Sequence, residues 1–206
     1  MWSWLTELRA IRRSLMTLAI LFFTVMLLEV DLGHAPALAR HSYLALIPVF
    51  WLPITLFSLM AVQIKPGLVT MSAALIVTAA AAAVGMIGSG LHMQAAGVDL
   101  EHLDRVFSST VWGGHESPNW PVAITLAAVF GFAAAVNAHR DNETLPPGLP
   151  GAATALAYVL IVAGIVCATV PGLAAIASAC LAFAALLLLG VLIAQLASAA
   201  MERKPS

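Results

Sequence analysis

Charged side chains are scarce in this sequence. They make up 9% of its 206 residues, whereas hydrophobic side chains make up 62%. A soluble domain carries about 25% charged residues. So few charges cannot cover a soluble fold of this size, so the composition predicts an integral membrane protein in a lipid bilayer. The net charge of −1 also argues against nucleic acid as a partner, since no strong basic field exists to attract it.

Cysteine is nearly absent as well. The only two, Cys167 and Cys180, lie inside apolar runs and form no CxxC or Cys/His spacing. This excludes zinc-finger and thioredoxin-like motifs. We expect both cysteines to be small buried hydrophobic residues.

Long apolar runs make up most of the sequence. Six segments reach the ~20 residues that a helix needs to cross a bilayer. Charged, proline-containing or glycine-containing breaks separate the later ones, at Lys65-Pro66-Gly67, at residues 140–147 and at Pro171-Gly172. The sequence therefore predicts an all-α integral membrane protein with one transmembrane domain, residues 1–206. Its six transmembrane helices are expected at residues 14–34, 42–64, 67–92, 119–138, 149–170 and 173–200.

The distribution of Lys and Arg predicts the orientation. Two of these residues, Arg40 and Arg105, fall on one side of the predicted spans, and the other side collects Arg9, Arg12, Arg13, Lys65, Arg140, Arg203 and Lys204. Positive residues accumulate on the cytoplasmic side. We therefore expect a multi-pass protein of the bacterial inner membrane with both termini in the cytoplasm.

The N-terminal segment resembles a secretory signal peptide. Three arginines precede an apolar run, and APALA at residues 35–39 offers an A-x-A cleavage pattern. However, the apolar run continues past Glu29 into Val30 and Leu32, which makes it long enough to span. We expect an uncleaved signal-anchor.

The outer loop, residues 93–118, is the largest segment between spans. Leu100, Leu103, Val106 and Phe107 recur at helical spacing between charged residues. This pattern predicts a short amphipathic helix at residues 99–108 on the outer surface.

Glycines within the spans predict close helix packing, because small residues let helix backbones approach each other in lipid. The expected contact positions are Gly85, Gly88, Gly90, Gly131, Gly164 and Gly190.

Ionisable residues gather at the predicted outer side. Glu29 lies about 22 Å along the first span from Ser14. A carboxylate at that depth costs about 2.5–3.5 kcal/mol unless it is paired or hydrated. Four histidines fall at a similar level, so we predict a cluster of candidate metal ligands: Glu29, His34, His41, His92 and His115.

Imidazole and carboxylate groups can bind Cu, Zn or Fe. Two facing histidines can also ligate a b-type haem, but no histidine lies deep in a span, so the pattern favours a metal ion over haem. The alternative is structural: Glu29 pairs with a neighbouring His or Arg, and the loop histidines are solvated.

Four stretches together suggest a family. They are Glu29 late in the first span, RHSYLALIPVFWLP at residues 40–53, GSGLHMQAAG at residues 88–97, and GGHESPNWPV at residues 113–122. This order resembles uncharacterised bacterial inner-membrane proteins encoded beside gluconate-dehydrogenase-type flavoprotein subunits. Gly88 to His92 fits their G-x-x-x-H element, whereas residues 114–118 depart from their GPP pattern. The resemblance implies an association with a redox enzyme.

Three functions remain open. The first is a non-catalytic membrane subunit that anchors or accompanies a periplasmic or outer-side oxidoreductase. The second is a metal- or haem-binding membrane protein that uses the outer Glu/His cluster. The third is a small transporter, which the sequence disfavours because the midplane carries few polar residues and transport sites usually lie there.

Overall fold

The structure, a computed structural model, describes residues 14–29, 43–98, 105, 108, 119–138, 148–170 and 172–202. The long helices within these ranges are Ser14–Glu29, α2 (Tyr43–Ile64), α3 (Leu68–Ala95), α5 (Asn119–Ala138), α6 (Leu149–Ala168) and α7 (Ala174–Glu202).

Five of these helices, α2, α3, α5, α6 and α7, are long and apolar enough to cross a membrane, and Ser14–Glu29 is apolar but shorter. The prediction of a helical multi-pass membrane protein is confirmed at this level. The helices begin and end within three residues of the predicted spans from the second to the sixth. The remainder of the predicted first span, residues 30–34, lies outside the described residues.

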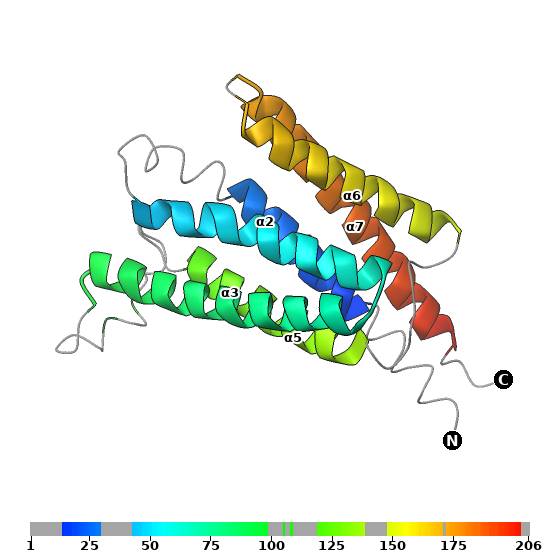
Figure 1. Cartoon of the computed structure of the whole chain (residues 1–206), viewed down its shortest axis with the longest axis horizontal. Coiled ribbons are helices and arrows are strands. Elements are labelled where there is room, and N and C mark those ends of the chain that lie inside the picture. The colour runs from blue at the N-terminus through cyan, green and yellow to red at the C-terminus, as the bar shows by residue number, and fades with distance from the viewer. Residues whose placement is uncertain are drawn as a thin grey trace.

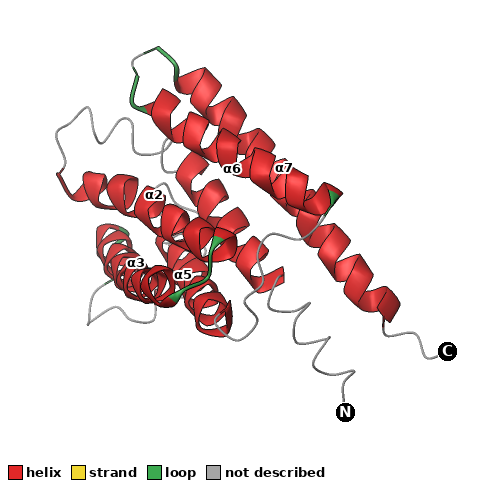
Figure 2. Ribbon diagram, turned by 45° about the vertical axis from the view of Figure 1, so that its right-hand side comes forward, coloured by secondary structure: helices red, strands yellow, loops and turns green. Residues whose placement is uncertain are grey.

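The helices form two groups (Figure 1). In the first group, α2 and α3 run antiparallel, α3 packs along α5, and Ser14–Glu29 lies beside them. In the second group, α6 and α7 pack against each other as a hairpin. Figure 2 shows that this hairpin crosses the first group obliquely instead of running parallel to it.

Short turns connect the antiparallel neighbours. Between α2 and α3, the Gly67 N–H donates to the Thr70 hydroxyl at 3.0 Å, which satisfies a backbone donor at the start of α3. Between α6 and α7, Gly172 has a φ of +87°, a conformation that side chains with a Cβ rarely adopt.

Large apolar side chains fill the interior. Phe23 and Ile20 of the first helix are fully buried, as are Leu52, Leu56 and Leu59 of α2. The same helices expose large apolar residues on their other faces, as a helix in contact with lipid does. In α2 these include Phe50 and Phe57, which are 63% and 40% exposed.

The glycine predictions hold at four positions. A Cβ at Gly85 or Gly88 of α3 would press against Pro121 of α5, and one at Gly131 of α5 would contact Leu59 and Thr78. A Cβ at Gly164 of α6 would press against Leu181 of α7.

The prediction is wrong at Gly90 and Gly190. A Cβ at either would meet no atom within 4 Å. Both glycines lie on exposed faces of their helices, away from the other described helices.

The predicted amphipathic helix at residues 99–108 lies outside the described residues, except for Arg105 and Ser108. The Ser108 N–H donates to the Arg105 carbonyl at 2.9 Å, which is a single turn of chain.

Candidate functional site

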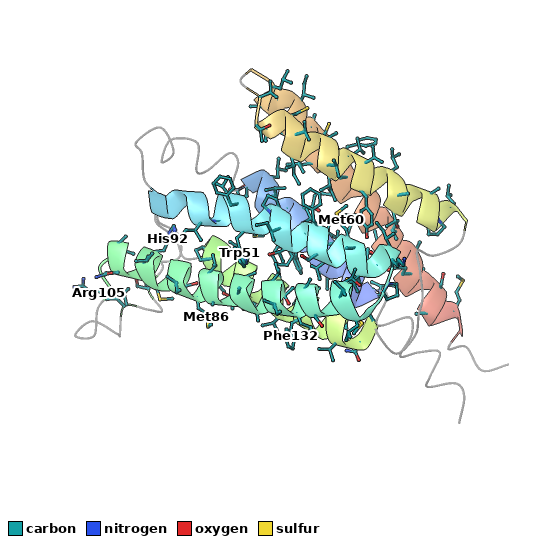
Figure 3. All side chains as sticks on the ribbon, in the orientation of Figure 1. Trp51, Met60, Met86, His92, Arg105 and Phe132 are labelled. Carbon is teal, nitrogen blue, oxygen red and sulfur yellow. The ribbon has the colours of Figure 1, made fainter. Side chains whose placement is uncertain are left out.

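Two of the five predicted metal-ligand candidates are described. Glu29 is the last residue of the first helix, and His92 lies in the last turn of α3; both side chains are partly buried. His34, His41 and His115 lie outside the described residues. Figure 1 shows that the first helix and α3 end on the same side of the molecule, and Figure 3 places His92 there.

The described part of this cluster does not form a metal site by itself. Among the described residues, no group of three or more His, Cys, Asp and Glu side chains could hold a metal ion. Glu29 and His92 alone would supply two ligands, whereas a structural zinc site takes four. The five-residue cluster therefore stays a prediction.

Three threonine hydroxyls in the middle of the helices bond within their own helix. The Thr24 hydroxyl donates to the Ile20 carbonyl at 2.8 Å, Thr55 to Trp51 at 2.9 Å, and Thr78 to Ala74 at 2.6 Å. All three threonines are fully buried. Each hydroxyl donates to the carbonyl four residues earlier in the chain, so it has no hydrogen left to donate to a ligand.

The indole of Trp51 forms a hydrogen bond between two helices. Trp51 Nε1–H of α2 donates to the Val77 carbonyl of α3 at 3.3 Å. An unpaired indole N–H would be costly in lipid, since no water is present to accept it. This bond fixes α2 against α3, and Figure 3 shows Trp51 between the two helices.

A second polar group lies at the opposite end of the first helix group from His92. The Tyr158 hydroxyl of α6 donates to Gln63 Oε1 of α2, and both residues are buried. Gln63 is the next-to-last residue of α2, whereas Tyr158 lies nine residues inside α6. The bond therefore joins the oblique hairpin to the end of the first helix group.

Two more side chains at this end have buried polar atoms. The Thr17 hydroxyl and both amide atoms of Gln195 are shielded from solvent and form no hydrogen bond with a described residue, although Gln195 as a whole is only partly buried. Thr17 lies one turn from the start of the first helix, and Gln195 lies seven residues before the end of α7.

The sequence indicates these polar groups only in part. Thr17 and Gln195 are rare polar residues in apolar spans, but isolated polar residues do not by themselves predict a site. The Gln63–Tyr158 bond joins residues 95 positions apart, so no local spacing indicates it.

Comparisons with protein-family models, with curated proteins and with solved structures gave no match.

Proposed function

We propose that this protein is a non-catalytic membrane subunit that anchors or accompanies a redox enzyme on the outer side of the bacterial inner membrane. In this proposal the first helix completes a sixth span, and both termini lie in the cytoplasm. The observation that carries the proposal is the apolar, closely packed interior of the described helices.

The placement of charge supports an anchoring role. Within the described residues, Asp, Glu, Lys, Arg and His side chains are limited to Glu29, Lys65, His92, Arg105 and Glu202, each at or beyond a helix end. Ionisable residues inside membrane helices usually mark ion or substrate pathways. The middle of these helices instead holds leucine, phenylalanine, alanine and self-bonded threonine, which favours a scaffold over a transporter.

The partner is inferred from the sequence motifs. The G-x-x-x-H element at residues 88–92 ends α3, at the same end of the molecule as Glu29. The resemblance links this element to proteins encoded beside flavoprotein oxidoreductases. Under the proposed orientation this end faces outward, so it is the surface on which a soluble oxidoreductase subunit would dock.

Co-purification from native membranes tests the partner. A tagged protein extracted in mild detergent is expected to retain a soluble flavoprotein subunit in stoichiometric amount, visible as flavin absorbance near 450 nm. Purification of the protein alone, without flavin, from cells grown on several carbon sources would contradict the proposal.

Cysteine labelling tests the orientation separately. Leu103→Cys in a background without Cys167 and Cys180 should react with a membrane-impermeant maleimide on intact spheroplasts. Lys65→Cys in the same background is the matched control and should react only after permeabilisation. The reverse pattern would place the termini outside.

A second candidate, metal binding at the outer end, is favoured by the common placement of Glu29 and His92. Elemental analysis of the detergent-purified protein should then find Cu, Zn or Fe near one equivalent. Absence of all three metals, together with no haem absorbance, would exclude metal binding and leave anchoring as the remaining candidate function.

A further inference from the structure

The end of α7 extends past the start of its hairpin partner α6. A Cβ at Gly164 of α6 would contact α7 over the turn 177–181. Leu149, the first residue of α6, lies fifteen residues before Gly164, so in an antiparallel pair it lies opposite about Ala194. The segment Gln195–Met201 of α7 therefore protrudes beyond α6 by about 10 Å. Figure 2 shows α7 continuing past the start of α6.

This protruding end, Gln195–Met201, has an apolar surface. Leu196 and Met201 are 52% and 68% exposed. The Ser198 hydroxyl is also exposed, but it donates to the Ala194 carbonyl at 2.9 Å, so its hydrogen is already used. The segment contains no Asp, Glu, Lys, Arg or His. Exposed apolar side chains without any charge among them are typical of a helix surface that contacts lipid.

The apolar part of α7 is too long to cross the hydrocarbon upright. It extends over Ala174–Met201, which is 28 residues and about 42 Å of helix. The hydrocarbon core of a bilayer is about 30 Å thick. A helix of this length fits that thickness when its axis is tilted by about 45° from the membrane normal, and tilting is one of the ways in which long helices accommodate such a mismatch.

The same tilt brings the two free ends of the hairpin to one depth. The axes of packed helices lie about 8–10 Å apart, and α7 protrudes beyond α6 by a similar length, about 10 Å. When the protrusion equals the separation, a tilt of about 45° in the plane of the hairpin places Leu149 and Met201 level. The thickness of the membrane and the stagger of the two helices therefore indicate the same angle.

The turn between α6 and α7 can lie at the membrane boundary or below it. The N–H groups of Thr169, Val170 and Leu173 each donate to the carbonyl three residues earlier, at 3.1 Å. The turn contains no charged residue. Backbone groups that are bonded within the protein can lie at membrane depth, so the turn does not oppose the tilt.

The first helix group does not need such a tilt. The apolar stretches of α2 and α5, Ile47–Ile64 and Pro121–Ala138, have 18 residues each. Each is about 27 Å long, close to the thickness of the hydrocarbon core. α3 is longer, but its last turn carries His92 and Gln94, which suit the polar boundary. The oblique crossing in Figure 2 agrees with one upright group and one tilted hairpin.

We propose that the α6/α7 hairpin is tilted by about 45° in the membrane and that the protruding end of α7 is an interaction surface for lipid acyl chains. Under the proposed orientation these chains belong to the cytoplasmic leaflet. The lipid head groups then lie at the level of Glu202 and the residues that follow it. The association with a redox enzyme plays no part in this proposal.

Spin labels on the full-length protein in liposomes test the lipid contact. Ala197→Cys, in a background without Cys167 and Cys180, carries a nitroxide on the exposed surface of the protruding end. Val159→Cys, on a 64% exposed position of α6, is the control for lipid. Gln94→Cys, on the exposed end of α3, is the control for water. Collisions with oxygen, which concentrates in lipid, and with a nickel chelate, which stays in water, are measured for each label.

The label at position 197 should resemble the one at position 159. Its ratio of oxygen to nickel collisions is expected to exceed the ratio at position 94 by at least about fivefold, because the hydrocarbon excludes the chelate. A ratio equal to that at position 94 would place the end of α7 in water and overturn the proposal. Protection from both reagents would also overturn it, and spin–spin broadening would then identify a second copy of the chain as the occupant.

The tilt itself is measured by solid-state NMR on the unlabelled protein in aligned bilayers. Amide ¹⁵N signals should give an angle of about 45° to the membrane normal for α6 and α7, and a smaller angle, near the average of about 20°, for α2 and α5. Equal tilts of α7 and α2, or an upright α7, would contradict the proposal whatever the redox partner proves to be.

Discussion

The α3/α5 pair and the α6/α7 pair are both closely packed at a glycine, but different atoms face the two glycines. A Cβ at Gly85 of α3 would meet the Thr125 hydroxyl oxygen first, and it would also lie 2.7 Å from the Pro121 carbonyl oxygen and 2.8 Å from the Thr125 backbone nitrogen. A Cβ at Gly164 of α6 would lie 2.8 Å from Leu181 Cγ, and its nearest backbone neighbour, the Ala177 oxygen, would be 3.3 Å away. The first contact therefore includes two backbone atoms closer than 3.0 Å besides a side chain, whereas the second is mainly against a side chain.

This difference shows how firmly each pair is fixed. A backbone cannot change rotamer, so α3 and α5 have one close approach at Gly85. Leu181 can turn to a new rotamer, so α6 and α7 can adjust. His92 lies two turns beyond Gly85 on the firmly fixed pair, whereas Tyr158 and Gln195 lie on the adjustable one. The end of α3 that carries His92 is thus held firmly against α5, whereas the Gln63–Tyr158 bond joins the first helix group to the more adjustable α6/α7 pair.

Gly85→Ala should have the largest effect. Its Cβ has to displace the backbone of α5, and overpacking of this kind typically costs 1–3 kcal/mol, so we expect a loss of about 3 kcal/mol. Reversible unfolding by SDS in mixed micelles measures it. Gly90→Ala on the same helix is the control and should leave stability unchanged or raise it by up to about 1 kcal/mol. Equal stabilities for Gly85→Ala and Gly90→Ala would show that the close approach at Gly85 does not fix α3 against α5.

Gly164→Ala should cost less, about 1–2 kcal/mol, because only a side chain has to yield. A double-mutant cycle with Leu181→Ala sharpens the difference. In the Leu181→Ala background the cost of Gly164→Ala should vanish, whereas Thr125→Ala should relieve Gly85→Ala only in part, since the Pro121 carbonyl and the Thr125 backbone nitrogen stay in place. Full relief in both cycles would mean that both contacts are adjustable.

Tyr158→Phe should cost about 0.6 kcal/mol and at most about 1.7 kcal/mol, the average and the maximum measured for hydrogen bonds between membrane helices. The change removes the donor to Gln63 and leaves that amide oxygen without its partner. Ser198→Ala serves as the control, because its hydroxyl bonds within α7 and is exposed. Adding Gln63→Leu should recover most of the loss. A loss from Tyr158→Phe no larger than that of the control would show that the bond does not hold the hairpin to the first helix group.

Glu29→Gln should change stability least, by no more than about 0.5 kcal/mol. The substitution keeps the shape of the side chain and removes its charge. If the five-residue cluster holds a metal ion, the purified variant should lose that metal while it remains folded. Metal content and the unfolding midpoint are measured on the same sample, and retention of a full equivalent of metal would exclude Glu29 as a ligand.

The helix boundaries were predictable because their causes are local. Lys65-Pro66-Gly67 and Pro171-Gly172 interrupt apolar runs that no other feature would end, and α2 to α7 follow those limits closely. The glycine contacts were predictable only in part. Gly85 and Gly90 look alike in the sequence, but one meets a neighbouring helix and the other does not.

The candidate sites were also predictable only in part. Glu29 and His92 could be placed at one end of the molecule from span order alone, since successive membrane helices alternate in direction. The pairing of Gln63 with Tyr158 could not be predicted, because it depends on the oblique crossing of α6 over α2.

The sequence by itself determined that this chain enters a membrane as apolar helices, where those helices begin and end, and which end carries histidine and carboxylate groups. The free energy of transfer from water to lipid depends on each residue and its near neighbours, so it can be read from the sequence. Only the tertiary structure decided which glycines touch another helix, which hydroxyls bond within their own helix, and which polar atoms remain without partners. A contact depends on the position of both members, and in lipid no water is present to satisfy the atoms that packing leaves unpaired.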